Sequence, residues 1–93
     1  MRKQATPDLI TRRTAGPRHL STVDRALTLL DLFSESRPES GLSELARLAG
    51  YDKATTRRFL VALGNHGYVE QDPESRKYRL GAALLRLANV RET

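Results

Sequence analysis

The sequence predicts a small, mainly α-helical domain that is completed by one β-hairpin and a further helix. Apolar residues recur at helical spacing in three separate segments between residues 21 and 65. Two short alternating segments then flank a polar turn that contains Pro73. The chain has 93 residues and no cysteine, so it has room for one modest core that packing alone must stabilise.

Residues 1–20 differ from the rest in charge. They hold five basic residues and one acidic residue, whereas residues 21–93 hold eleven basic and ten acidic residues. We expect a basic arm without sustained secondary structure, and its candidate contacts with a polyanion are Arg12, Arg13 and Arg18. A solvated tail, or the remnant of an expression tag, is the alternative. No apolar run resembles a signal peptide or a membrane span, so a soluble, cytoplasmic protein is expected.

The first helix is predicted over residues 22–34. Ser21 followed by Asp24 is typical of a capping box. The predicted apolar stripe consists of Val23, Ala26, Leu27, Leu30 and Phe33. Pro38 and Gly41 oppose continuation of the helix.

A second and a third helix follow in close succession. Leu42 is expected in a short extended link, after which Ser43 caps a helix of about eight residues that stops at Gly50. The inward residues of this helix are predicted to be Leu45, Ala46 and Ala49. Asp52 is a good cap for the third helix, which ends at residues 65–67. Its predicted core side consists of Thr56, Phe59, Leu60 and Leu63.

Residues 68–71 and 76–80 are predicted to pair as a hairpin around the turn at residues 72–75. Strand alternation places Val69, Tyr78 and Leu80 on one face. Gly81 ends the hairpin, and a last helix is expected from Ala82 to Val90.

The order of these elements predicts a winged helix-turn-helix, with a three-helix core, a wing and a C-terminal linker helix. The turn of about three residues at Gly50 suits a helix-turn-helix. A helix with small residues and arginines on its outward side can enter the major groove of DNA, which is about 12 Å wide. The candidate reading residues are Lys53, Ala54, Thr55, Arg57 and Arg58. An ordinary solvated helix face is the alternative for these residues.

Basic residues in the hairpin favour the DNA-binding interpretation. Arg76 and Lys77 follow the turn, where a wing can lie on the flanking backbone or minor groove. With Arg79 included, the third helix and the hairpin hold six of the eleven basic residues of the folded region.

The chain resembles the N-terminal domain of the IclR family of bacterial transcriptional regulators, from residue 21 to about residue 90. The segments that carry the resemblance are STVDRAL (21–27), Leu30, LSELA (42–46), KATTRRFL (53–60), Leu63, GYV (67–69) and DPESRKYRLG (72–81). Ala54 and Thr56 depart from the family pattern, in which Ser and an aliphatic residue are common.

The resemblance implies sequence-specific binding to a palindromic double-stranded DNA operator, as a homodimer or higher oligomer. It also implies a separate C-terminal domain that senses a small-molecule effector. We therefore expect a basic arm at 1–20, a DNA-binding domain at 21–81, and at 82–93 the start of a linker helix towards an effector domain absent from this chain. A winged-helix module that binds RNA or a protein is the alternative function.

Apolar residues outside the expected core suggest a contact with a second copy. The candidates are Leu29, Leu32 and Leu85. A core closed within one domain is the open alternative. An enzyme is not expected, because the histidines are scattered and neither a metal-ligand spacing nor a phosphate loop is present. No catalytic residue, cofactor, metal or membrane partner is therefore expected.

Overall fold

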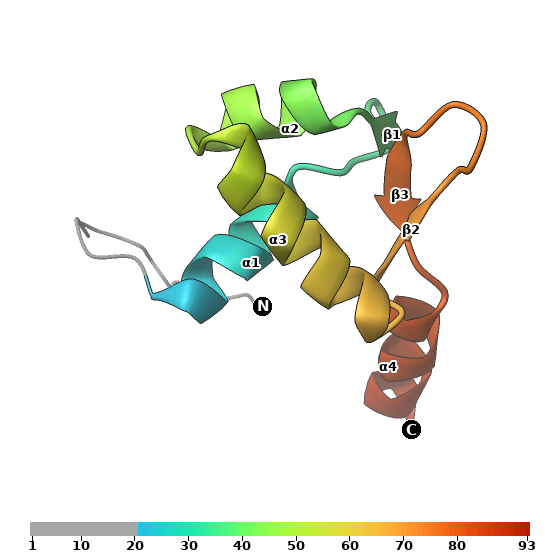
Figure 1. Ribbon diagram of the computed structural model, residues 1–93. Coiled ribbons are helices and arrows are strands. Elements are labelled where there is room, and N and C mark those ends of the chain that lie inside the picture. Colours follow the sequence, from blue (N-terminus) through green and yellow to red (C-terminus); the bar gives the residue numbers. More distant parts are fainter. Residues whose placement is uncertain (1–20) are drawn as a thin grey trace.

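The computed structural model describes residues 21–93, which form three packed helices, a small sheet and a fourth helix (Figure 1). In chain order the elements are α1 (Thr22–Asp31), β1 (Glu39–Ser40), α2 (Leu42–Ala49), α3 (Lys53–Asn65), β2 (Val69–Gln71), β3 (Tyr78–Leu80) and α4 (Ala83–Glu92). The fold class predicted from the sequence is confirmed.

Helix α1 begins as predicted and ends earlier. The Ser21 hydroxyl accepts a hydrogen bond from the Asp24 N–H at 3.0 Å, and the Asp24 carboxylate accepts from the Ser21 N–H at 3.1 Å. The predicted end at Ser34 is wrong, because the chain turns away after Leu32. Arg37 Nη1 donates to the Leu32 carbonyl oxygen at 2.8 Å, and Ser34 and Arg37 pair through both backbone groups. The turn thus satisfies a carbonyl that a longer helix would have used.

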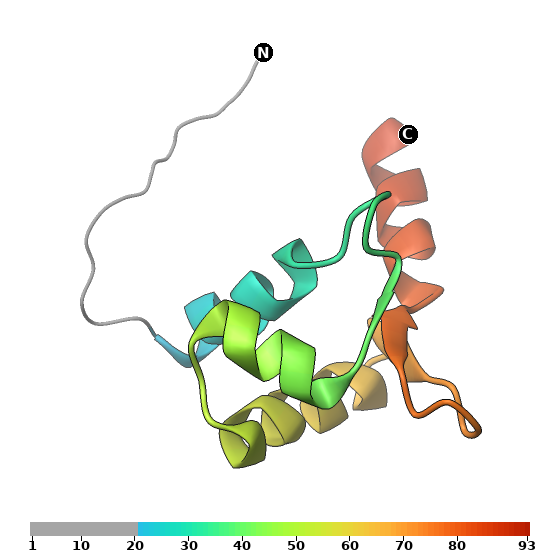
Figure 2. The same ribbon diagram turned by 90° about the horizontal axis from the view of Figure 1, so that it is seen from above.

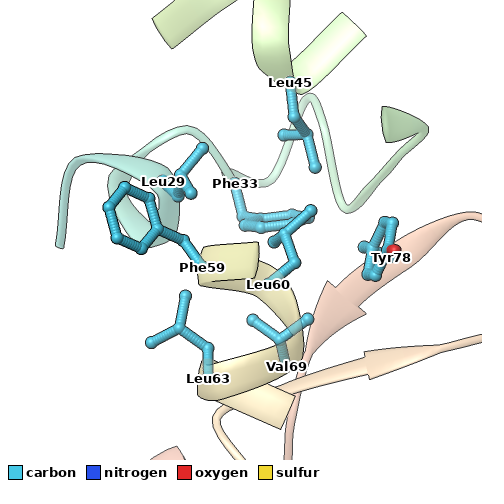
Figure 3. Packing of buried hydrophobic residues seen from close by; sticks show 8 residues of the cluster. All are labelled: Leu29, Phe33, Leu45, Phe59, Leu60, Leu63, Val69 and Tyr78. Carbon is cyan, nitrogen blue, oxygen red and sulfur yellow. The ribbon is translucent and has the colours of Figure 1, made fainter. Parts of the chain in front are cut away.

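The buried side of α1 also differs from the predicted stripe. Leu29 is fully buried, whereas Val23 and Leu27 are 66% and 51% exposed. Two apolar stripes overlap on this helix, and contacts with α2 and α3 select the one that contains Leu29. Phe33, which the predicted stripe includes, is buried just beyond the end of the helix (Figure 3). Periodicity within one helix cannot make that choice, because it carries no information about the neighbouring elements.

Helix α2 starts one residue before the predicted cap. Leu42 is its first residue, and the extended segment lies instead at Glu39–Ser40. Ser43 is therefore not the N-cap, since Gly41 occupies that position without a side-chain hydrogen bond. Gly50 ends the helix as predicted, in the left-handed conformation at φ 79°.

Helix α3 agrees with the prediction at both ends. Asp52 is its N-cap and accepts a hydrogen bond from the Thr55 N–H at 2.7 Å. Its buried residues are Thr56, Phe59, Leu60 and Leu63. Thr56 is fully buried, and its hydroxyl donates to the Asp52 carbonyl oxygen at 2.8 Å. The core therefore accommodates a polar residue here without an unpaired hydroxyl.

The hairpin is part of a three-stranded antiparallel sheet in the order β1-β3-β2. Tyr78 pairs with Ser40 on one side and with Gln71 on the other. Val69 and Tyr78 are buried as predicted, but Leu80 is 43% exposed. Strand alternation fixes the face on which Leu80 lies, but it does not determine how completely the other described elements cover that face.

The core lies where α1, α2, α3 and the sheet meet (Figure 3). It consists of Leu29, Phe33, Leu45, Phe59, Leu60, Leu63, Val69 and Tyr78. Helix α4 leaves this core and extends away from it (Figures 1 and 2), and Ala83 is its only buried residue. Within residues 21–93, no helix is both long enough and apolar enough to cross a membrane.

Candidate nucleic-acid interface

The side of α3 that faces away from the core carries the predicted reading residues. Lys53, Ala54, Arg57 and Arg58 are exposed, and Thr55 is half-buried. Val61 is 45% exposed further along the helix. The outward face therefore combines small side chains, which permit close approach, with cations that can donate to guanine or phosphate oxygens.

The turn between β2 and β3 is held by a dense set of hydrogen bonds. The Arg76 N–H donates to the Asp72 carbonyl oxygen at 2.8 Å, and the Asp72 N–H donates to the Lys77 carbonyl oxygen at 2.9 Å. Gln71 Nε2 donates to the Arg76 carbonyl oxygen at 3.0 Å. Arg76 and Lys77 are both exposed on this fixed turn. We call residues 72–77 the wing turn.

Arg76 adopts a backbone conformation that few residues with a Cβ tolerate. Its φ is 66°, and it is the only residue other than glycine with positive φ within residues 21–93. The left-handed region costs an L-residue about 1–2 kcal/mol. Glycine would avoid that cost, which makes Arg76 a candidate for a role of its side chain.

A hollow of about 330 Å³ lies between the wing turn and helices α2 and α3. Arg57 of α3 and Arg76 of the wing turn both line it, together with the first residues of α2. Figure 2 shows α3 and the wing turn along one side of the molecule. The structure thus brings two cations that are 19 positions apart in the sequence to one concave surface.

Within residues 21–93 the cations of this side form no ion pair, although the Glu44 side chain also lines the hollow and the charge of Arg58 acts on Asp52. The ion pairs within residues 21–93 involve Arg37 and Arg47, which contact Glu44, and Arg79, which contacts Glu70. All three arginines lie outside α3 and the wing turn. We call Lys53, Arg57, Arg58, Arg76 and Lys77 the open cation set.

Arg79 has a different environment although it follows Lys77 by two positions. It lies on the outward face of the sheet, where the register places Glu39 on one side of it and Glu70 on the other. Its Nε lies 3.3 Å from Glu70 Oε1. This sheet face carries more acid than base and is not part of the candidate interface.

Two carboxylates near the open cation set already accept backbone hydrogen bonds. The N–H of Thr55 holds the pKa of Asp52 below its ordinary value, and the charge of Arg58 contributes in the same direction. The N–H of Glu74 likewise lowers the pKa of Asp72. Both carboxylates therefore stay ionised, and their main role is to fix the start of α3 and the wing turn.

Sequence reasoning did not find the part of the hollow formed by α2. Gly41, Ser43 and Gln71 line it beside the arginines. No periodicity or spacing signals this position, because pairing of β1 with β3 brings the start of α2 to the wing turn. The arm candidates Arg12, Arg13 and Arg18 lie outside the described residues.

The predicted dimer residues separate into two groups. Leu29 is fully buried, so the prediction that it contacts a second copy is wrong. Leu32 is partly buried against the core and belongs with Leu29. Leu85 is 66% exposed, and Leu87 and Val90 on the same helix are 46% and 67% exposed.

Comparison with known proteins identifies the fold and its function class. The model of the IclR helix-turn-helix domain matches residues 22–73, from α1 into the wing turn. The chain belongs to the IclR family. The regulator XynR of Escherichia coli is 42% identical over 66 residues, and these cover 71% of this chain and 26% of XynR. The glycerol operon regulatory protein of Streptomyces griseus is 39% identical over 72 residues, which cover 77% of this chain and 28% of that protein.

Solved structures agree with this assignment. A Silicibacter protein assigned to the IclR transcriptional regulators superposes with a TM-score of 0.75 at 51% identity, over 77% of this chain and 28% of that one. The IclR family regulator of Brucella abortus gives a TM-score of 0.70 at 31% identity, over 75% of this chain and 26% of that one. This IclR chain spans about a quarter of the length of the curated relatives it matches. It carries a DNA-binding helix-turn-helix domain of transcriptional regulators.

Proposed function

We propose that this IclR domain reads double-stranded DNA with α3 in the major groove and the wing turn on the flanking backbone or minor groove. The open cation set carries the proposal, because its five exposed cations lie on α3 and the wing turn and form no ion pair within residues 21–93. Unpaired cations can exchange their counterions for phosphates, which drives association with DNA.

The members of the open cation set have different roles in this proposal. Arg58 lies in the outward row with Ala54 and Val61, where an arginine can donate two hydrogen bonds to one guanine. Arg57 and Arg76 line the hollow from two elements and are assigned to one stretch of backbone phosphate. Lys53 and Lys77 add phosphate contacts at the two ends of that stretch of DNA backbone.

The whole regulator is proposed to act as a dimer on a palindromic operator. Exposed Leu85, Leu87 and Val90 on α4 are the surface for contact with a second copy, in place of the buried Leu29. Small-molecule sensing is assigned to a separate C-terminal domain, because the matched regulators are about four times as long as the matched segment.

Selection from a random duplex library by the 93-residue chain, followed by salt titration, tests the DNA proposal. We expect an enriched motif and a steep salt dependence, with a slope of about −0.9 for each phosphate contact. An RNA duplex of the same sequence should bind more weakly, because the A-form major groove is too narrow for α3. Absence of an enriched motif, or equal binding of the RNA duplex, would contradict the proposal.

Sedimentation with DNA that holds one or two half-sites tests the dimer. Two copies should bind the two-half-site duplex cooperatively, and Leu85→Ser should remove the cooperativity while leaving the affinity for one half-site unchanged. Val23→Ser, at an equally exposed apolar residue of α1, serves as the matched surface control. Independent binding of one wild-type copy to each half-site would contradict the dimer.

A further inference from the structure

The start of α4 is fastened to the hairpin by a residue far from it in sequence. Helix α4 has no side-chain cap of its own, since Ala82 occupies the cap position. Instead, Glu70 Oε2 on β2 accepts a hydrogen bond from the Ala82 N–H at 3.2 Å. The Gly67 carbonyl oxygen accepts from the Ala83 N–H at 3.1 Å. These two contacts satisfy N–H groups that begin a helix and would otherwise lack partners.

Few other contacts hold the direction of α4. Ala83 is its only buried residue and Leu84 is half-buried, whereas the helix from Leu85 onward is exposed. Figures 1 and 2 show α4 projecting away from the three-helix core. The first turn therefore sets the direction of the whole helix, and the Glu70 carboxylate is a principal side-chain contact in that turn.

The same carboxylate also holds Arg79. Glu70 Oε1 accepts a hydrogen bond from Arg79 Nε at 3.3 Å, while Oε2 faces Ala82. Each contact fixes the rotamer that the other one needs, so the two contacts support each other. Glu39, which pairs with Arg79 from the opposite strand, has no hydrogen bond to α4 within residues 21–93.

We propose that Glu70 is a positioning residue that couples the direction of α4 to whether Arg79 is bound to its carboxylate or released from it. While Arg79 holds one carboxylate oxygen, the other caps α4. Loss of the Arg79 contact frees the Glu70 side chain and loosens the cap. By reciprocity, a pull on α4 that breaks the cap changes how readily Arg79 is released.

The coupling between Arg79 and α4 does not depend on the proposed DNA-binding function, and its failure would leave that function untouched. Amide hydrogen exchange of the free 93-residue chain, measured by NMR, therefore tests the coupling alone. The exchange of the Ala82 amide is the readout, and the amides of the buried residues Leu45 and Leu60 report whether each variant remains folded.

Removal of the carboxylate should loosen the cap. We expect Glu70→Ala to speed Ala82 exchange about threefold to tenfold, which is the range for one lost hydrogen bond. Glu70→Gln keeps an acceptor oxygen and should restore most of the protection. Glu39→Gln removes the same charge beside Arg79 and should leave Ala82 unchanged. Equal exchange in Glu70→Ala and Glu39→Gln would overturn the assignment of the cap to Glu70.

Substitution of Arg79 tests whether Glu70 only caps α4 or also couples α4 to Arg79. Arg79→Gln touches no atom of α4, but it should speed Ala82 exchange about twofold by releasing the Glu70 side chain. The same change in a Glu70→Ala background should have no further effect. An unchanged Ala82 amide in Arg79→Gln would overturn the coupling even if Glu70→Ala behaves as expected.

Discussion

Arg76 and Arg79 lie three positions apart in one hairpin, but the fold gives them opposite environments. Arg76 lies on the wing turn, beside the hollow and without a carboxylate at ion-pair distance within residues 21–93. Arg79 lies on the outward face of the sheet between Glu39 and Glu70. The first arginine keeps its charge available to a ligand, and the second has its charge largely neutralised by neighbours.

The comparison shows that the number of basic residues does not define a DNA-binding surface. Surface ion pairs add little to stability, but they determine which cations can release counterions to a polyanion. The backbone at Arg76 agrees with this division, because its φ of 66° places a strained arginine where glycine would fit.

The largest effect is expected for Arg58→Ala on α3. If Arg58 donates to a base edge, its loss should cost about 1–3 kcal/mol on the selected sequence and less on random duplex. Competition binding with single-base variants of the selected site measures this difference. An equal loss on every sequence would show that Arg58 contacts phosphate, which would reduce the open cation set to a sequence-independent surface.

Arg76→Ala and Arg79→Ala form a matched pair within the hairpin. Arg76→Ala should weaken binding to all duplexes alike and make the slope of log K against log salt shallower by about 1. Arg79→Ala should leave the slope unchanged, because Glu70 already neutralises that charge. Equal slopes for the two variants would break the distinction between open and paired cations.

Arg76→Gly separates stability from binding. Glycine relieves the left-handed conformation, and after its own entropy cost the free energy of unfolding should rise by up to about 1 kcal/mol. DNA affinity should fall as in Arg76→Ala. Urea denaturation and binding titration measure the two quantities. A loss of stability in Arg76→Gly would show that the arginine side chain itself supports the turn.

The smallest effect is expected from the acidic cap of α3. Hydrogen bonding lowers the pKa of Asp52 in the folded chain, so its contribution to stability is present above the unfolded value of about 3.9 and is lost as the pH falls through the folded value. Asp52→Asn keeps a cap oxygen without this titration. The stability difference between wild type and Asp52→Asn should therefore shrink below about pH 4. A difference that stays constant down to pH 2 would contradict this assignment.

Local signals predicted the elements that depend on a few adjacent residues. The capping box at Ser21, the Asp52 cap and the stop at Gly50 each use hydrogen bonds or backbone freedom within about four positions. The core side of α3 was predictable too, because its apolar stripe is unambiguous and its outward side is polar or small.

Contacts between distant segments could not be predicted in this way. Pairing of β1 with β3 places Glu39 beside Arg79 and brings the start of α2 to the wing turn, and no periodicity encodes either result. The choice between two apolar stripes on α1 likewise depends on α2 and α3. The sequence pattern therefore predicts the candidate residues on α3 and on the turn, but only the folded structure shows that Arg57 and Arg76 share one surface.

The close approach of the backbones at Gly67 and Gly81 limits where this domain can be joined to another protein. A Cβ on Gly81 would overlap the Gly67 carbonyl group, so a side chain there requires a shift of the backbone, and Gly67 itself has φ 80°, where a side chain is strained. A chimeric protein that joins this helix-turn-helix domain to a different domain should keep both glycines, and its junction should lie beyond the first turn of α4. A junction placed upstream of Gly81 would separate the two backbones that fix the start of α4.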